Sequence, residues 1–203
     1  MAKKDKAKVL TREIPAKIRM LKREPEDPEA EPTESRTFQL SFSSEEPYDR
    51  WFGPEILDHS DGAVNLDRLN EMGVLLYNHD RDNVVGRIDR AWIEEGRGEA
   101  QVTFDEDEAS DVIYNKVKSG TLKGVSVGYI VRRYEEVESG GTSSDGRFTG
   151  PAQVATDWVP LEISIVSIPA DLTVGVGRSF EPDHKSAATA IAEKQVMINK
   201  NYI

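Results

Sequence analysis

The stretch GVSVGYIV, residues 124–131, decides the fold because its letters fit two incompatible structures. Its first five residues match G-x-S-x-G, a pattern typical of a reactive serine held at a sharp turn between a strand and a helix. The residues after the pattern are Tyr129, Ile130 and Val131, which favour β structure. A turn requires a helix directly after Ser126, whereas a strand requires that the alternation of side chains continue past it.

The surrounding residues favour the strand. The clearest helical pattern, DEASDVIYNKVKSG at 107–120, lies before Ser126, and GVSVGYIVRRYEEVE alternates as a strand over 124–138. The α/β-hydrolase fold, which carries the turn motif, also needs an acid and then a histidine after the serine. Only His184 follows Ser126, in a polar terminal segment. The sequence therefore excludes that fold and predicts a strand through Ser126.

Strand patterns predominate elsewhere in the chain. A short helix is expected over 64–73, with Asn65 as its N-cap and Gly73 at its end. The segments 84–95 and 98–106 form a predicted hairpin joined at Gly96-Arg97-Gly98. Further strands are predicted at 37–42, 74–80 and 156–170. We therefore expect a mainly β fold with about two helices.

Composition excludes several classes of function. The net charge of -11 argues against a protein that binds nucleic acid through its overall charge. The absence of cysteine excludes disulfides, a thiol nucleophile and thiolate metal sites. No apolar run approaches the roughly 20 residues of a membrane span, and no apolar segment of a secretory signal follows the basic N-terminus. We expect a soluble, cytoplasmic protein.

Both ends of the chain differ in composition from its middle. Residues 1–35 are basic, then acidic and proline-rich, and are expected to form a flexible tail, with a short helix over 11–21 as an alternative. Residues 36–178 form the expected core. Residues 179–203 are polar and alanine-rich, with a helix expected over 185–199. A chain of 203 residues suits one core with two tails.

A serine nucleophile needs a general base, and the chain offers three histidines. His59 lies in the turn-rich LDHSDG and is expected at the surface. His184 lies beyond the expected core. His79 ends the apolar segment VLLYNHD, where a strand terminus can present an imidazole at the rim of a sheet. A structural role for His79, bonded to a turn, is equally compatible with its position.

The base in turn needs a group that orients it. Glu162 is an acid inside an otherwise apolar strand, where it is costly unless paired, and on a two-residue period it shares a face with Ser164. A salt bridge from Glu162 to Arg132 or Arg133 is the structural alternative. Asp80, next to His79, is a rival orienting group.

Three motifs occur in an order that resembles a known family. LLYNHD with VVGRID, then VKSGTLKGVSVGYIV, then LEISIVSIPAD are similar to the prohead maturation serine proteases of tailed phages, over about residues 38–178. The resemblance implies an α+β, mainly β fold: a single β-barrel-like core of antiparallel strands with a few surrounding helices, similar to herpesvirus assembly proteases. It makes Ser126 the nucleophile, His79 the general base and Glu162 the third member, where related proteases have a histidine.

The resemblance also implies a role. Such a serine endopeptidase cleaves scaffolding or capsid protein segments, and itself, inside the assembling procapsid in the cytoplasm of the bacterial host. Its expected partners are a scaffolding protein and the major capsid protein. The resemblance is also compatible with a homodimer or higher oligomer. No cofactor or metal is expected. Gly124 and Gly128 would allow close approach to Ser126, and Arg132 shares its strand face and would help to bind substrate or the oxyanion. The alternatives are an inactive relative that binds capsid or scaffold proteins, and a hydrolase that does not act on peptides.

Overall fold

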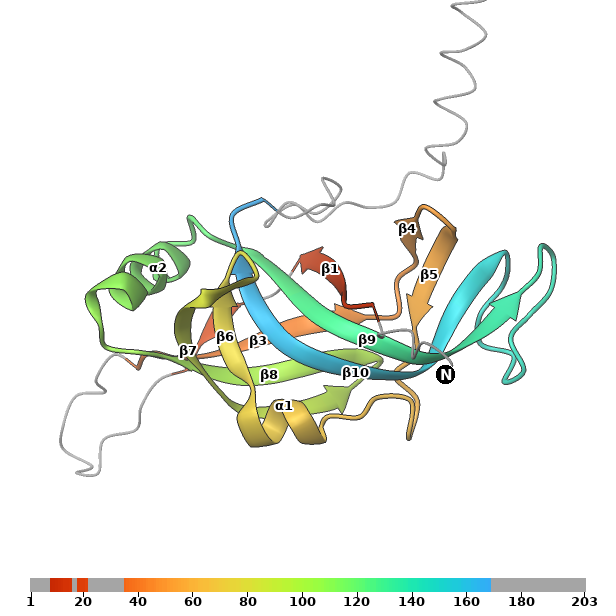
Figure 1. The fold of residues 1–203 in the computed structure, drawn as a ribbon, viewed down its shortest axis with the longest axis horizontal. Helices are drawn as coiled ribbons and strands as arrows, with labels where there is room; N and C mark the ends of the chain where they lie inside the picture. Colours follow the sequence, from red (N-terminus) through yellow and green to blue (C-terminus); the bar gives the residue numbers. More distant parts are fainter. Residues whose placement is uncertain (1–7, 16–17, 22–34, 169–203) are drawn as a thin grey trace, which may run out of the picture.

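The structure is a computed structural model that describes residues 8–15, 18–21 and 35–168 (Figure 1). These residues form one curled sheet of ten strands and two helices. The elements are β1 (Leu10–Pro15), β2 (Arg19–Met20), β3 (Thr37–Ser44), β4 (Tyr48–Arg50), β5 (Gly53–Leu57), α1 (Asp67–Met72), β6 (Val74–Tyr77), β7 (Asp80–Glu94), β8 (Arg97–Phe104), α2 (Glu108–Lys118), β9 (Gly124–Val137) and β10 (Ala152–Val166). Neither helix is long and apolar enough to cross a membrane.

The strand order places β9 and β10, which carry Ser126 and Glu162, next to each other. The order is β1-β9-β10-β6-β7-β8-β3-β2, with β5 pairing both β4 and β10. Most pairs are antiparallel, but β10 runs parallel to β5 and β6. Figure 1 shows β9 and β10 as two long strands side by side, and they form the longest ladder of the sheet. The predicted mainly β fold is confirmed, with these two parallel pairings as an addition.

The core lies on one face of β9 and β10. Val125, Val127 and Tyr129 of β9 pack in the main apolar cluster with Ile163 and Ile165 of β10. Burial of each large aliphatic side chain contributes about 1.5–3 kcal/mol. Because side chains alternate along a strand, the residues between them point to the opposite face. The core therefore fixes which side chains of both strands are available for chemistry.

A β-bulge divides β10 just before this region. The register of β10 against β9 shifts between Pro160 and Glu162, which leaves Leu161 without a partner residue. Trp158 and Ile163 both belong to the core although they lie five positions apart, which in a regular strand would place them on opposite faces. Pro160, opposite Tyr129, is tolerated next to this bulge because the bulge already interrupts the hydrogen-bond ladder there. The bulge therefore lets both halves of β10 bury apolar side chains on one face.

Most predicted elements are confirmed and some are wrong. The strand through 124–138 continues past Ser126, and α2 is capped by Asp107, whose side chain accepts hydrogen bonds from the N–H groups of Ala109 and Ser110. The backbone N–H of Gly73 bonds to Leu69 at the end of α1 as expected, but α1 begins after Leu66 without a side-chain cap, so Asn65 is not its N-cap.

The N-terminal segment differs from the expected tail. Residues 10–15 and 19–20 form β1 and β2, where a helix over 11–21 was the alternative to a flexible tail. β1 pairs with β9, and β2 pairs with β3. These residues therefore belong to the sheet. The expected C-terminal tail, its helix over 185–199 and His184 lie outside the described residues.

Candidate active site

The two central strands bring three side chains to one face. In the antiparallel ladder Ser126 of β9 lies opposite Ser164 of β10, and Gly128 lies opposite Glu162. All four positions lie on the face away from the core cluster formed by Val125 and its neighbours. Ser126 and Ser164 are buried, and Glu162 is partly buried. The strand pairing alone therefore places a serine and a carboxylate next to each other.

His79 reaches this face from the tight turn between β6 and β7. Tyr77 pairs with Asp80, so Asn78 and His79 form a two-residue loop, and both have positive φ (53° and 60°), as a type I′ hairpin requires. Asparagine adopts this conformation readily, whereas histidine does so at some cost in strain. A strained conformation persists only where surrounding contacts enforce it.

Those contacts come from β10. The backbone N–H of Asn78 donates to the carbonyl of Ile165 (2.9 Å), and the Asn78 side-chain oxygen accepts from the backbone N–H of Ser167 (3.0 Å). The backbone N–H of His79 donates to Ser164 Oγ (3.1 Å). The turn is thus fixed to the strand that carries Glu162, which holds the imidazole in place.

A continuous line of hydrogen bonds joins the three side chains. His79 Nε2 lies 2.7 Å from Ser126 Oγ, and His79 Nδ1 lies 2.6 Å from Glu162 Oε1. The Ser164 hydroxyl donates to the other carboxylate oxygen, Glu162 Oε2, at 2.7 Å. Because a carboxylate only accepts, Nδ1 carries the proton and Nε2 is free to accept from the Ser126 hydroxyl. This tautomer is the one that a general base needs.

The electrostatics of the site favour a proton on His79. The hydrogen bond that His79 donates to Glu162 raises the pKa of His79 above its usual 6.5, burial opposes this rise, and the charges of Glu162 and Glu13 add to it. The same interactions stabilise the imidazolium that forms when the base takes a proton. The arrangement can therefore both orient His79 and support its charged form.

Gly128 provides the space that Glu162 occupies. A Cβ added at Gly128 would lie 2.3 Å from Glu162 Oε1, the oxygen bonded to His79. Atoms do not approach so closely, and the carboxylate would have to move. Gly128 was expected to allow close approach to Ser126; in the structure, the space it leaves is occupied by the Glu162 carboxylate.

We expect Gly128→Ala to lower kcat/KM for a peptide substrate by about 10²-fold while the protein stays folded, because a displacement of about 1 Å in a catalytic group has this effect. Gly141→Ala is the matched control, since an added Cβ there meets only backbone atoms of Glu138, the nearest being O at 3.2 Å. Peptide hydrolysis and thermal unfolding of both variants check the expectation. Wild-type activity in Gly128→Ala would contradict it.

The structure contains a second buried serine–histidine pair, but there the histidine is bonded to a backbone carbonyl and not to a carboxylate. His59 Nε2 lies 2.7 Å from Ser43 Oγ, but its Nδ1 lies 2.8 Å from the carbonyl of Leu57. Burial lowers the pKa of His59 to about 4. The prediction that His59 lies at the surface is wrong, because the ring packs edge-on against Trp158. A neutral imidazole held by a carbonyl suits a structural role.

The other candidate residues have other partners. Arg132 forms an ion pair with Asp157 (3.9 Å) and lies six residues, or about 20 Å, along β9 from Ser126, so the structure does not bring it to the site. Arg133 donates to Thr156 Oγ1 (3.1 Å), so neither arginine pairs with Glu162. Asp80 accepts from the backbone N–H of Asp82. Gly124 lies between Pro15 and Val166 in the sheet.

Sequence reasoning missed two supporting residues. Ser164 bridges the His79 backbone and Glu162, and its place on the face of Glu162 was visible in the two-residue period of the strand. Asn78 anchors the turn, and an Asn in a pair between two strands is a hairpin signal. In both cases the sequence shows the position but not the contact.

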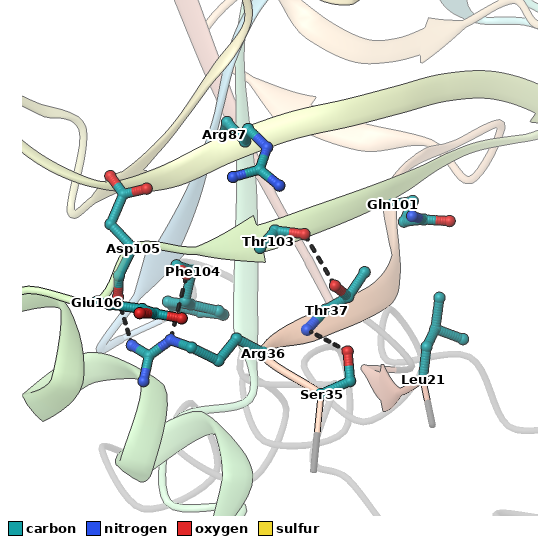
Figure 2. Close-up of a pocket in the computed structure, with 10 residues that line it drawn as sticks. All are labelled: Leu21, Ser35, Arg36, Thr37, Arg87, Gln101, Thr103, Phe104, Asp105 and Glu106. Carbon is teal, nitrogen blue, oxygen red and sulfur yellow. Dashed lines mark hydrogen bonds between the residues drawn. The ribbon is translucent and has the colours of Figure 1, made fainter. Parts of the chain in front are cut away.

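A separate cavity of about 570 Å³ lies away from this site (Figure 2). Figure 2 shows the Arg36 side chain turned toward the carbonyl groups of Phe104 and Asp105, with Thr37 bonded to Thr103 across β3 and β8. Its walls contain none of the three site residues. Among the described residues no group of three or more His, Cys, Asp or Glu side chains could hold a metal ion.

Ser126 and Glu162 on adjacent strands, joined through His79 in the β6–β7 turn, have the geometry of a serine hydrolase. The comparison with protein families points to one family. The model of the caudovirus prohead serine protease family matches residues 60–185, more than half of the chain and all three site residues. The chain belongs to this family.

Two individual proteins are similar to this chain. The major capsid protein of Halomonas phage phiHAP-1 is 38% identical over 146 residues, which are 70% of this chain and 23% of that protein. The chain thus spans about a quarter of the length of that relative. The structure of the bacteriophage T4 capsid assembly protease, gp21, aligns with 78% of this chain and 99% of its own at 12% identity, with a TM-score of 0.44.

Proposed function

We propose that this protein is a serine endopeptidase that cleaves scaffolding or capsid protein segments, and itself, during maturation of a phage procapsid. The observation that carries the proposal is the line of hydrogen bonds from Ser126 through His79 to Glu162. It contains a nucleophile, a histidine base in the tautomer that catalysis needs, and an acid that orients the base, all within hydrogen-bond distance. Membership of the prohead serine protease family supports the same activity.

In the proposed reaction, Ser126 is the nucleophile and His79 transfers the protons. Ser126 Oγ attacks the scissile carbonyl carbon, and His79 Nε2 takes the hydroxyl proton while Glu162 stabilises the imidazolium. The C–N bond then breaks, and His79 returns the proton to the leaving amine, which gives an ester between Ser126 and the acyl part of the substrate. Water, deprotonated by His79, attacks the ester, and Ser126 regains its proton as the acid is released.

The family and the named relative support the choice of substrate. The family is defined by proteases of the phage prohead, and the relative phiHAP-1 protein is a major capsid protein that shares 38% identity with this chain. A protease and its substrates assembled within one shell meet at high local concentration. We propose the major capsid protein and a scaffolding protein as partners, inside the procapsid of the infected host cell.

Co-expression with the cognate capsid and scaffolding proteins tests the proposal. We expect new fragments of the scaffold or capsid protein, and loss of one or both terminal segments of this chain, with wild type but not with Ser126→Ala. Ser43→Ala is the matched control and should give the wild-type fragments, because Ser43 contacts the structural His59. Identical fragments from Ser126→Ala would assign the cleavage to another protease. Intact proteins with the wild type would favour an inactive relative that only binds its partners.

A further inference from the structure

The N-terminal strand β1 lies directly beside the candidate nucleophile. It pairs antiparallel with β9 along one edge, with Glu13 opposite Ser126 and Thr11 opposite Gly128. Figure 1 shows β1, in red, next to β9. Ser126 has 0% of its surface exposed. A peptide bond cannot reach Ser126 Oγ in this arrangement, so a neighbouring element has to move before a substrate is attacked.

Of the two strands that flank β9, only β1 can leave without destroying the site. β10 carries Glu162 and anchors the turn of His79, so its departure would break both hydrogen bonds of the imidazole network. β1 contributes no side chain to those bonds. Its departure would expose the edge of β9 at Ser126, where backbone N–H and C=O groups are available to a new strand.

β1 is held in the manner of a bound peptide. Its side chains alternate, with Arg12 and Ile14 buried and Leu10 packed against the core. From the neighbouring β4, Arg50 donates to the carbonyl of Thr11 at 2.8 Å, and the Tyr48 hydroxyl donates to Glu13 at 3.1 Å. Main-chain pairing with alternate side chains in pockets is the mode by which extended peptides are added to a sheet edge.

The central contact of β1 is a poor one. Arg12 is 1% exposed, and although its Nη2 donates to the carbonyl of Glu46, its Nε and Nη1 are buried without a hydrogen-bond partner among the described residues. Burial of the guanidinium and the nearby charge of Arg50 lower the pKa of Arg12. Buried charged donors without partners destabilise the state that contains them. β1 therefore binds β9 less tightly than its pairing would allow.

We propose that β1 occupies the place of the substrate. When β1 leaves, the edge of β9 from Gly124 to Tyr129 binds an extended peptide in place of β1. The peptide carries apolar side chains at the positions of Leu10, Arg12 and Ile14, because an apolar group in the central position avoids the unpaired nitrogens. The chain's own residues 10–15 then keep the protease closed until such a peptide displaces them. The proposal rests on the proposed function in naming this peptide a substrate.

Glu13 explains why β1 would inhibit rather than be cleaved. It lies opposite Ser126, and its charge acts on His79. Attack on a peptide bond produces an oxyanion beside the serine, and a carboxylate at that place repels it. A displacing peptide with a neutral side chain at the Glu13 position lacks this repulsion. Occupation by β1 thus blocks the site without promoting its own hydrolysis.

Binding of a labelled peptide to the full chain tests the proposal. The probe is VLTREIPAK, the sequence of residues 9–17, and the protein carries Ser126→Ala so that cleavage plays no part. Adding Arg12→Glu places a carboxylate near the buried Glu55, releases β1 and should tighten probe binding by about tenfold or more. Adding Arg12→Met should weaken it by about tenfold, because β1 then docks without unpaired donors. Lys8→Glu has the same charge change as Arg12→Glu at an exposed residue and should leave binding unchanged.

Equal probe affinity in the Arg12→Glu and Arg12→Met variants, or no binding to either, would overturn the proposal. If Arg12→Glu fails to fold, hydrogen exchange of the otherwise unaltered chain decides: we expect the amides of β1 to exchange well before those of β10. Exchange of β1 only on global unfolding would show a fixed strand and overturn the proposal. If the variants change probe binding as expected but the wild type never cleaves a substrate, only the proposed function is refuted. If the wild type cleaves but the Arg12 variants do not change probe binding, only the role of β1 is refuted.

Discussion

Ser126→Ala is expected to abolish covalent labelling by a fluorophosphonate probe and to lower peptide hydrolysis by about 10⁴-fold or more. The hydroxyl of Ser126 is the atom that His79 Nε2 contacts at 2.7 Å, and alanine has no group to attack a carbonyl or phosphorus centre. His79→Ala should have an effect of similar size, because the nucleophile and its base act as a unit and their losses do not add. Gel fluorescence after long incubation and a peptide cleavage assay measure both effects.

Ser43→Ala is the matched control for this prediction. Ser43 is as buried as Ser126 and has the same 2.7 Å contact with a histidine ring, but that ring is bonded to a backbone carbonyl. We expect full labelling and a loss of about 1–3 kcal/mol in the free energy of unfolding, because His59 Nε2 loses its donor. Labelling that persists in Ser126→Ala would refute the assignment of the nucleophile.

Glu162→Gln is expected to lower kcat by about 10³–10⁴-fold without unfolding the protein. The Ser164 hydroxyl donates to Glu162 Oε2, so it selects the orientation in which the oxygen of the glutamine amide faces Ser164. The NH₂ group then faces His79 Nδ1 and donates to it. His79 is left with its proton on Nε2 and cannot accept the proton of Ser126. Adding Ser164→Ala to this variant removes that selection and should restore part of the activity.

The pH profile of kcat/KM gives an independent measure of the same contact. A general base acts when neutral, so activity is full above the pKa of His79 and falls as the pH drops through it. The hydrogen bond from His79 to Glu162 is the largest cause that raises this pKa above 6.5, so the wild type should lose activity already above pH 6.5. Glu162→Gln should move this loss to lower pH while the plateau falls. An unchanged profile would show that Glu162 does not act on His79.

The parts of the fold that could be predicted are those in which local pattern and tertiary structure agree. β9 and β10 alternate because one face packs in the core, so the two-residue period already placed Glu162 and Ser164 together. α2 carries its own capping residue, Asp107, which marks its start in the sequence. The candidate site could be proposed from the sequence because few histidines were available and one of them lay at the end of a predicted strand.

The rest depends on contacts that sequence patterns do not contain. β1 combines charged residues with a proline, and it becomes a strand only because the edge of β9 supplies its partner. His59 lies in a turn-rich segment, yet Ser43 and Trp158 enclose it from strands far away in sequence. Asn65 suits an N-cap, but the helix begins two residues later and its first turn has no side-chain cap. In each case tertiary structure overrides a local preference.

The bulge at Leu161 uncouples the orientation of the two halves of β10. Because Leu161 lies unmatched between them, the two halves of β10 can rotate about the strand axis independently. Trp158 fixes the rotation of the first half, and Ile163 fixes that of the second. Substitutions that rotate or lengthen the first half are absorbed at the bulge and do not turn the acid away from its histidine. The first half of β10 therefore tolerates changes in its rotation, while the half that carries Glu162 keeps its orientation toward His79.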